Sequence, residues 1–435
     1  RKTLFQIMVS KRKARETAAD LLGESGKKAV QLWKQVKKDV KSRVLNAEQS
    51  NTSIIYEKDF FFKLYRKLDA ALNPDLEITR FLTEVANFPN VPQYAGALEL
   101  KTGKSENMVL GMMQSLVENQ GDAWTYMGDV VRRYFERVLI EQKDTKSVPA
   151  MKGSLVKPVS YEKIPDKIKH YLGGVATERA ALLGIRTAEM HLALASDTDN
   201  KDFKPEAFSL HYQRSVYSSL QSSVRGTFQV LEKNLKKLDE HVRKEAEDVR
   251  GMRKDILKCM QQIYAHKIDT MKIRTHGDYH LGQVLFTGKD FIILDFEGEP
   301  ARTYSERRLK RSPLRDVAGM IRSAHYAAYN GLFRTEAFTK GEAEYLDDWA
   351  EQWYHYMSSA FMRAYIDRCK GSNFLPDNTE DLDILLQTFL LEKAVYELGY
   401  ELNNRPGWSI IPIKGIQYIM RRYYEDEQKK QSKKA

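Results

Sequence analysis

With 435 residues, 42% of them hydrophobic, the chain is too long for one compact core and predicts two or three lobes. Its net charge of +11 gathers largely in the terminal stretches and is elsewhere mixed with acids, as on solvated helix faces, so nucleic-acid binding is not expected. The two cysteines, Cys259 and Cys369, exclude a disulfide framework and favour the cytoplasm. No apolar run approaches the roughly 20 residues that a membrane-spanning helix needs.

The first part of the chain is expected to form a small sheet with one inserted helix. Residues 1–43 look helical and charged, with Leu32, Val36 and Val40 at helical spacing. The chain begins with Arg, which is consistent with a piece of a longer polypeptide. A helix is predicted from Asn73-Pro74, because Asn is a good cap and Pro suits the first turn. Five short strands are predicted around it: Arg43–Glu48, Ser53–Glu57, Phe60–Tyr65, Gly96–Leu100 and Asn107–Met113.

Helices dominate the chain from Trp124 onward. They are predicted over 177–195, over 206–267 and from Arg315 to the end. The sheet returns only in three short strands, at 272–275, 283–286 and 291–295. We therefore expect an α+β fold with a small β-rich N-terminal lobe and a large, mostly helical C-terminal lobe. The predicted parts are a helical cap or linker at 1–43, an N-lobe at 44–117 and a C-lobe at 118–435.

The segment THGDYHLGQVLFTGKDFIILDFEGEP carries the most informative chemistry. It places Asp278 in a loop, Gln283 at the start of a predicted hairpin and Asp295 at its end. A hairpin holds its two ends side by side, so these three side chains should converge. Phosphoryl transfer needs a carboxylate to orient the attacking hydroxyl and accept its proton, and oxygen ligands for magnesium. Taken singly, Asp278 and Asp295 could simply cap a turn and end a strand, but their combined spacing with His276 favours the catalytic interpretation.

These motifs resemble the catalytic and metal loops of the aminoglycoside-phosphotransferase-like kinases, which are relatives of protein kinases. The resemblance implies a bilobal protein-kinase-like fold, ATP and Mg²⁺ as cofactors, Asp278 as catalytic base, and Gln283 and Asp295 as metal ligands. Those families usually carry Asn where this chain has Gln283. The fuller strings HGDYHLGQVL and DFEGEP resemble the maltokinases within this group, which phosphorylate maltose at its anomeric carbon. In some bacteria such a kinase follows a trehalose synthase in one chain, so a fused or associated trehalose synthase is an expected partner.

The ATP phosphates have two candidate binding elements. Lys63 lies among apolar residues in a predicted strand, which is a costly place for a lone ammonium group, and Glu77 could pair with it. The resemblance assigns this pair to the nucleotide; alternatively Lys63 points to solvent from an edge strand, or Arg66 or Lys67 takes its place. A glycine-rich loop is missing. In its place the resemblance suggests that the polar run Ser50, Asn51, Thr52 and Ser53 covers the phosphates, although a plain polar turn would look the same.

Two histidines and one late helix complete the candidate sites. His276 and His280 have the i, i+4 spacing of a zinc-binding helix, but the glycines around them indicate a loop. We expect His276 to brace the catalytic loop and lie near the substrate. On the late helix, four residues share one face and resemble a sugar site of aromatic rings and charged groups, although a core stripe is an open alternative. They are Lys393, Tyr396, Glu397 and Tyr400.

The expected function is phosphorylation of maltose to maltose 1-phosphate by ATP. A kinase for an amino sugar or aminoglycoside is the first alternative, because Glu392, Glu397 and Glu401 could form the acidic patch that a polycation needs. A kinase-like module that binds without catalysis is the second alternative. Retention of both Asp278 and Asp295 counts against that module.

Overall fold

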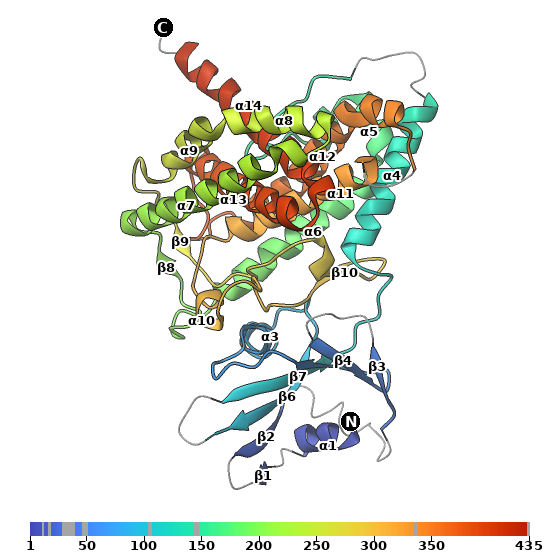
Figure 1. Ribbon diagram of the computed structural model, residues 1–435. Coiled ribbons are helices and arrows are strands. Elements are labelled where there is room, and N and C mark those ends of the chain that lie inside the picture. Colours follow the sequence, from blue (N-terminus) through green and yellow to red (C-terminus); the bar gives the residue numbers. More distant parts are fainter. Residues whose placement is uncertain are drawn as a thin grey trace. The chain divides into compact units, whose positions relative to one another are not determined.

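The computed structural model describes residues 1–10, 13–15, 19–27, 40–45, 51–102, 107–141, 148–333 and 337–432. The chain divides into two compact units (Figure 1). The first unit comprises Arg1–Ala123, Glu189–Lys204 and Ile273–Lys310, and the second comprises Trp124–Ala188, Pro205–Lys272 and Arg311–Ala435. The expected α+β bilobal fold is therefore confirmed. The predicted division at 1–43, 44–117 and 118–435 stays a prediction, and the first unit differs from it by including residues 189–204 and 273–310.

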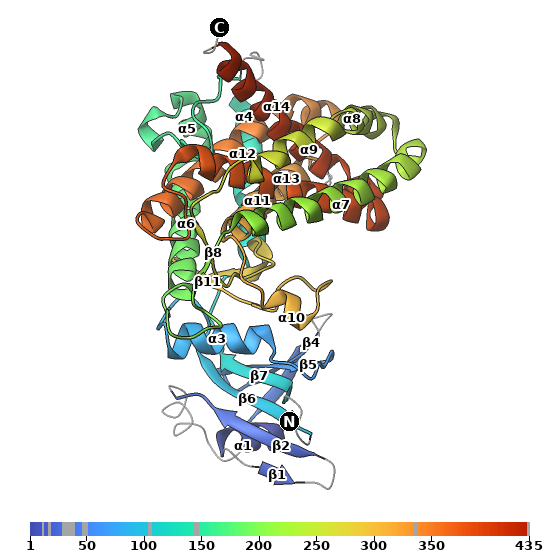
Figure 2. The same ribbon diagram turned by 90° about the vertical axis from the view of Figure 1, so that its left-hand side faces the viewer.

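An antiparallel sheet of seven strands forms the centre of the first unit, in the order β1-β2-β6-β7-β5-β4-β3 (Figure 2). The strand bounds are β1 Lys13–Arg15, β2 Asp20–Ser25, β3 Ser42–Leu45, β4 Asn51–Tyr56, β5 Phe60–Tyr65, β6 Tyr94–Lys101 and β7 Met108–Ser115. The five predicted strands are thus confirmed with small shifts at their ends. Strand β5 lies between β4 and β7, so its side chains are not at an edge of the sheet.

The N-terminal stretch is only partly helical, so the prediction for residues 1–43 is wrong in part. Helix α1 spans Lys2–Val9, but β1 and β2 follow it and extend the sheet. Strand β2 pairs with β6 from Asp20↔Lys101 to Ser25↔Gly96. Backbone hydrogen bonds to β6 therefore make Asp20–Ser25 a strand, although the local sequence pattern predicted a helix. The predicted stripe residues Leu32 and Val36 lie outside the described residues.

Helices α1 and α3 (Pro74–Glu84) cover opposite faces of the sheet. Met113 of β7 belongs to the apolar cluster that contains Phe5 and Met8 of α1. Its neighbour Met112 belongs to a second cluster with Leu76 of α3. Successive residues of a strand point to opposite faces, so the two clusters are the two faces of this sheet. Each face is therefore closed by one short helix.

Helix α3 begins where the sequence predicts. The side chain of Asn73 accepts hydrogen bonds from the backbone N–H groups of Asp75 and Leu76, and Pro74 occupies the first turn. This cap satisfies two of the N–H groups that a helix start leaves without partners. It also fixes the position of Asp75, which is buried.

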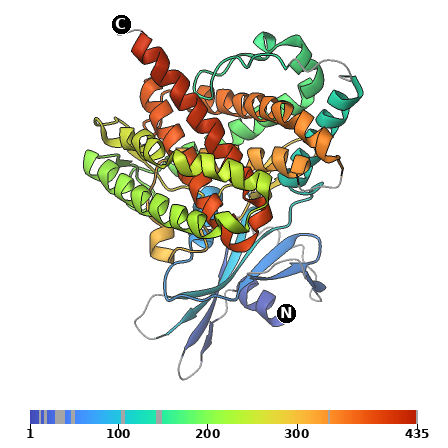
Figure 3. The ribbon, with the colours of Figure 1, turned by 45° about the horizontal axis from the view of Figure 1, so that its top comes forward.

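The second unit is mainly helical, and Figure 3 shows its long helices from above. Helix α13 is its centre, since it packs against α7, α11 and α14. No helix in the described part of the chain has the length and apolar character needed to cross a membrane. The main helices are α4 Ala123–Glu141, α5 Asp166–Leu172, α6 Gly174–Leu194, α7 Leu210–Asn234, α8 Glu240–Gly251, α9 Arg253–Gln261, α11 Leu314–Phe333, α12 Lys340–Cys369, α13 Thr379–Asn404 and α14 Ile410–Ser432. Strands β8 Glu206–Ala207 and β9 Met271–Lys272 form a short pair.

The cap of α3 can be tested by substitution. Asn73→Ala should destabilise the protein by about 1 kcal/mol, because two backbone donors lose their acceptor. The shift of the urea midpoint, followed by circular dichroism, measures this loss. Asn73→Ser keeps an acceptor at the cap and should remain close to the parent protein. An unchanged midpoint for Asn73→Ala would show that the cap contributes nothing.

Candidate functional site

A short hairpin brings two of the predicted site residues together. Strands β10 (Val284–Phe286) and β11 (Phe291–Ile293) pair in the register Val284↔Ile293. Gln283 precedes β10 and Asp295 follows β11, and Gln283 Nε2 donates to Asp295 Oδ2 at 2.9 Å. The expected convergence of these two residues is observed, while their role as metal ligands stays a prediction. The Gln283 amide oxygen, which this bond does not use, is the kind of ligand that Mg²⁺ accepts.

His276 ties the Asp278 loop to the end of the same hairpin. His276 Nε2 lies 2.7 Å from the carbonyl oxygen of Leu294, so this nitrogen carries the proton. Its Nδ1 then accepts the backbone N–H of Asp278 at 3.4 Å. The ring is almost fully buried, which agrees with the predicted bracing role. The Asp278 carboxylate itself is partly exposed and lies 4.0 Å from His280 Nε2.

The backbone of the Asp278 loop passes very close to the loop that follows Asp295. Gly277 has a φ of +88°, and a Cβ placed on it would lie 3.2 Å from the Cα of Gly298, which itself has a φ of +72°. Glycine permits both the left-handed conformation and the close approach. The lack of a side chain at both positions therefore lets the two loops approach each other closely.

Lys63 is the central cation of the site. Its Nζ lies 2.7 Å from Asp295 Oδ1 and 3.0 Å from Asp75 Oδ2, and the residue is 5% exposed. Burial opposes its charge, but the carboxylates of Asp295, Asp75 and Glu297 outweigh burial and raise the pKa of Lys63. The alternative of a solvent-facing lysine on an edge strand is wrong, because β5 is internal. The predicted contact with the ATP phosphates stays a prediction.

The predicted partner of Lys63 was wrong. Asp75, and not Glu77, makes the ion pair. The two acids are two residues apart on α3, which is about 200° around the helix, so they cannot face the same way. Asp75 Oδ1 also accepts the backbone N–H of Phe296 at 3.0 Å, which binds α3 to the segment after Asp295.

Glu77 instead forms a buried link to the strand that precedes the catalytic loop. Its carboxylate lies 2.8 Å from Arg274 Nη2 and 2.8 Å from Arg308 Nη2. Burial opposes the negative charge, but hydrogen bonds and attraction from Arg308 and Arg274 lower the pKa of Glu77. The Arg274 guanidinium lies over the ring of Phe203 at 5.3 Å, and that ring stacks on Phe81 of α3 at 3.6 Å. Helix α3 thus contacts Arg274 directly through Glu77 and indirectly through Phe81, whose ring stacks on Phe203.

Asp295 adopts an unusual backbone conformation. Its φ is +65°, a region that is uncommon for residues other than Gly, Asn and Asp. Its carboxylate is engaged by both Lys63 and Gln283. Burial opposes the charge, but Lys63 outweighs it and lowers the pKa of Asp295. Glu57 and Asn87 also have positive φ, so this angle does not by itself mark a functional site. What distinguishes Asp295 is that Lys63 and Gln283 both hold its carboxylate.

Glu297 is a site residue that the sequence interpretation missed. Asp75, Asp295 and Glu297 each offer an oxygen within 4.8 Å of the others, and in the described residues they form the one group of three acids, histidines or cysteines with the geometry to hold a metal ion. Burial and the charges of Asp295 and Asp75 raise the pKa of Glu297 to about 7. Three neighbouring carboxylates repel one another and offer only oxygen ligands, which suits a hard divalent cation such as Mg²⁺. The sequence could have indicated this residue, because Glu297 is the second acid of DFEGEP and lies two positions after Asp295.

The predicted phosphate-covering residues lie in a strand and not in a loop. Ser50 falls outside the described residues, whereas Asn51, Thr52 and Ser53 open β4. Ser53 pairs with Lys63 across the sheet, and its buried Oγ has no hydrogen-bond partner in the described structure. Asn51 Nδ2 donates to Glu297 Oε1 at 2.7 Å. Strand pairing with β5 thus overrides the turn-like composition, and contact with phosphates stays a prediction.

The four predicted sugar-binding residues share helix α13 in the second unit. Tyr396 and Tyr400 are 41% and 48% exposed, so the alternative of an aromatic core stripe is wrong. Lys393 Nζ lies 5.5 Å from the centre of the Tyr396 ring. Glu397 Oε2 accepts hydrogen bonds from Nε and Nη2 of the buried Arg322, at 2.9 and 2.8 Å. Their role in sugar binding stays a prediction.

The buried Glu77 cluster allows a direct test. Glu77→Gln removes the charge that two arginines share, and should destabilise the protein by about 3–5 kcal/mol at pH 7. Because the pKa of Glu77 is lowered in the fold, its stabilisation exists above the ordinary carboxyl pKa and is lost on acidification. The difference in denaturation midpoint between the variant and the parent should therefore shrink towards low pH. Glu118→Gln makes the same change on the surface and should leave the midpoint unchanged; equal behaviour of both variants would contradict the cluster's role.

Comparison with curated proteins finds similarity to glucosamine kinases over part of the chain. No protein-family model matches the sequence. The glucosamine kinase of Mycolicibacterium smegmatis is 31% identical over 140 residues, which is 32% of this chain and 32% of that protein. That of Streptacidiphilus jiangxiensis is 27% identical over 143 residues, 33% of this chain and 30% of that protein. The aligned region therefore spans about a third of these curated relatives.

Comparison of structures extends the similarity to almost the whole chain. A solved glucosamine kinase in complex with glucosamine, ADP and inorganic phosphate superimposes with a TM-score of 0.70. The match covers 98% of this chain and 87% of that one, at 18% identity. The chain therefore has the bilobal, protein-kinase-like fold of these glucosamine kinase structures.

Proposed function

We propose that the protein transfers the terminal phosphoryl group of ATP to a hydroxyl group of an amino sugar. The observation that carries this proposal is the cluster around Lys63, in which Asp75, Asp295 and Glu297 converge. A buried ammonium beside a group of carboxylates is suited to nucleotide phosphates and their Mg²⁺. The similarity to glucosamine kinases supports the same activity.

Asp278 is the proposed catalytic base. Its backbone is fixed through His276, while its carboxylate is partly exposed. It can therefore orient the acceptor hydroxyl and take its proton as the oxygen attacks phosphorus. Such positioning, together with electrostatic stabilisation of the phosphates, is the main contribution of a protein to phosphoryl transfer.

Mg²⁺ would be held by oxygens of Asp295 and Glu297, with Gln283 or Asp75 beside them. When bound, the ion would neutralise charge on the phosphates. Lys63 would then be freed in part from Asp295 to contact a phosphate oxygen. Ser53, whose hydroxyl pairs with nothing in the described structure, is suitably placed across from Lys63 to donate to the same group.

Helix α13 favours a sugar with one amino group. Glu392 and Glu401 are already paired, with Arg315 at 2.8 Å and Arg405 at 2.7 Å. Glu397 accepts both hydrogen bonds from Arg322 at Oε2, so its Oε1 has no partner in the described part of the chain. One available carboxylate oxygen suits a single ammonium group better than the polycation of an aminoglycoside. Maltose and a trehalose synthase partner, which the motifs alone suggested, are not supported by the relatives found.

The catalytic base can be tested by Asp278→Asn. The amide cannot accept the proton, so kcat should fall by about 10²–10⁴-fold. ATP affinity, measured by calorimetry, should stay near that of the parent protein because the Lys63 cluster is untouched. Asp269→Asn, an exposed site, serves as the matched control. Near-normal turnover in Asp278→Asn would overturn the assignment of the base.

The substrate can be tested by ADP release with MgATP and a panel of glucosamine, glucose, maltose, trehalose and kanamycin. Glucosamine should give the highest kcat/KM. Glu397→Gln should reduce the preference for glucosamine over glucose, because the ammonium group loses its charged partner. Highest activity with maltose would restore the maltokinase hypothesis. Absence of ADP release with every sugar would favour a module that binds without catalysis.

A further inference from the structure

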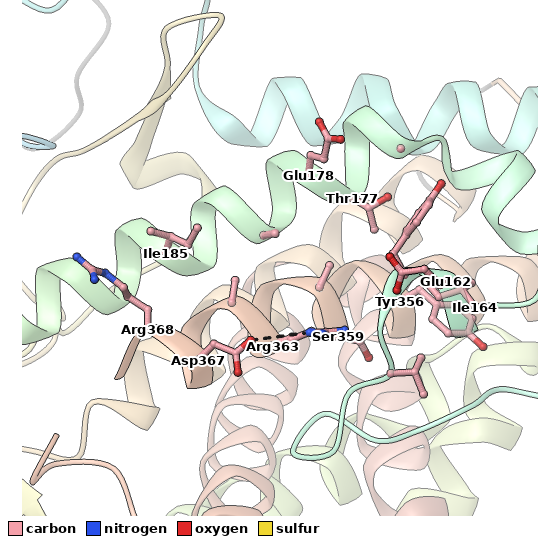
Figure 4. A pocket seen from close by; sticks show the side chains of 16 residues that line it. Glu162, Ile164, Thr177, Glu178, Ile185, Tyr356, Ser359, Arg363, Asp367 and Arg368 are labelled. Carbon is pink, nitrogen blue, oxygen red and sulfur yellow. Dashed lines mark ion pairs between the residues drawn. The ribbon is translucent and has the colours of Figure 1, made fainter. Parts of the chain in front are cut away.

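A pocket of about 680 Å³ lies within the second unit, and none of the candidate site residues lines it (Figure 4). One face of α6 and one face of α12 form its walls, and the segment around Val159 and Ile164 completes it. We propose that this pocket binds a small amphipathic organic anion, with the apolar body between the two helices and a carboxylate or phosphate head at the basic residues beside them. Its volume is within the roughly 300–1,000 Å³ of small-molecule sites.

The walls of the pocket are apolar because small and aliphatic residues face it at helical spacing. Ala181 and Ile185 line it from α6, and Ala360 and Ala364 line it from α12. Next to these residues the two helices touch at Gly184, where a Cβ would collide with the carbonyl oxygen of Phe361. That contact fixes the spacing of the helices, while the short alanine side chains leave space between them. The space is therefore a consequence of fixed helix packing.

One buried polar group in the pocket has no partner in the described structure. Ser359 is 2% exposed, lines the pocket, and its Oγ makes no hydrogen bond. The neighbouring hydroxyls are satisfied, since Thr177 Oγ1 donates to the carbonyl oxygen of Gly173 and the Tyr356 hydroxyl accepts the backbone N–H of Lys152. A buried hydroxyl without a partner costs about 1–3 kcal/mol. A ligand whose body carries one polar atom beside Ser359 would satisfy this hydroxyl, whereas a plain alkyl chain would not.

The charge beside the pocket determines the sign of the ligand. A second pocket of about 550 Å³ shares Arg363 and Asp367 with the first and is lined in addition by Lys157 and Lys163. Arg363 is partly neutralised by Asp367 at 3.8 Å, drawn as a dashed line in Figure 4. Lys157 and Lys163 are exposed and make no ion pair with any described residue. This side of the combined site therefore carries a net positive charge.

The acids of the first pocket orient the ligand. Glu162 and Glu178 are exposed at its rim, and Figure 4 shows the Glu178 carboxylate pointing away from α12. They disfavour an anionic group in the apolar pocket and leave the basic pocket as the place for the head. Burial of an aliphatic body between α6 and α12 supplies the affinity, and the lysines supply the selectivity for an anion.

Calorimetry on the full chain without ATP tests this proposal with four probes: decanoate, decanol, decylamine and inorganic phosphate. Decanoate should bind more tightly than decanol, and decylamine and phosphate alone should bind weakly or not at all. Lys163→Glu should weaken decanoate about fivefold or more, whereas Lys244→Glu, on an exposed helix face elsewhere, should not. Ala360→Leu fills the pocket and should abolish binding while the melting temperature is retained.

The outcomes are distinguishable. If the folded parent protein does not bind decanoate, or binds decanol equally well, the proposal is wrong. The proposal is also wrong if Lys163→Glu leaves the affinity for decanoate unchanged. Lys163 is exposed, so this substitution should not affect folding. If Ala360→Leu does not fold, Lys157→Glu, a change of an exposed residue in the basic pocket, replaces it and should weaken decanoate as Lys163→Glu does. Kinase activity is not part of the readout, so failure of this proposal leaves the proposed function untouched.

Discussion

The buried ammonium of Lys63 is the interaction on which the first unit depends. It lies in an internal strand, where a lone charge would be very unfavourable, and two carboxylates meet it within 3.0 Å. Asp75 comes from α3 and Asp295 from the end of the β10–β11 hairpin, so one cation joins sheet, helix and hairpin. Asp75 also accepts the N–H of Phe296. Removal of the ammonium would leave Asp75 and Asp295 facing each other without a cation in a poorly solvated place.

Around this cluster the backbone is arranged to bring loops together. Gly277 and Gly298 approach each other closely, and Asp295 adopts a left-handed conformation between two side-chain partners. His276 connects the catalytic loop to Leu294. The Glu77 cluster then fastens α3 to Arg274, just before that loop. Side chains that would carry the chemistry are therefore positioned by contacts that themselves take no part in it.

The raised pKa of Glu297 and the lowered pKa of Asp295 follow from the same arrangement. Asp295 has Lys63 as its direct partner, whereas the Glu297 side chain, among the described residues, is hydrogen-bonded only to the amide of Asn51. The pKa values of Asp295 and Glu297 are therefore shifted in opposite directions, although the two residues are only two positions apart. A divalent cation held between them would lower the pKa of both carboxyl groups, because it would attract both negative charges.

Much of this protein was predictable from local pattern. The hairpin with Gln283 and Asp295 at its ends, the Asn73 cap of α3 and the strands from 42 to 115 all follow from residue types at short spacing. The tertiary structure decided the rest. Lys63 pairs with Asp75 and not with Glu77. Both acids lie in the first turn of α3, and which of them faces Lys63 depends on how the helix packs against the sheet. The tertiary structure also made strands of β1 and β2, and placed Asn51 and Ser53 in β4, because hydrogen bonds to a neighbouring strand come from residues far away in the sequence. The sequence by itself thus determined which groups are available for chemistry, and the tertiary structure decided which of them meet.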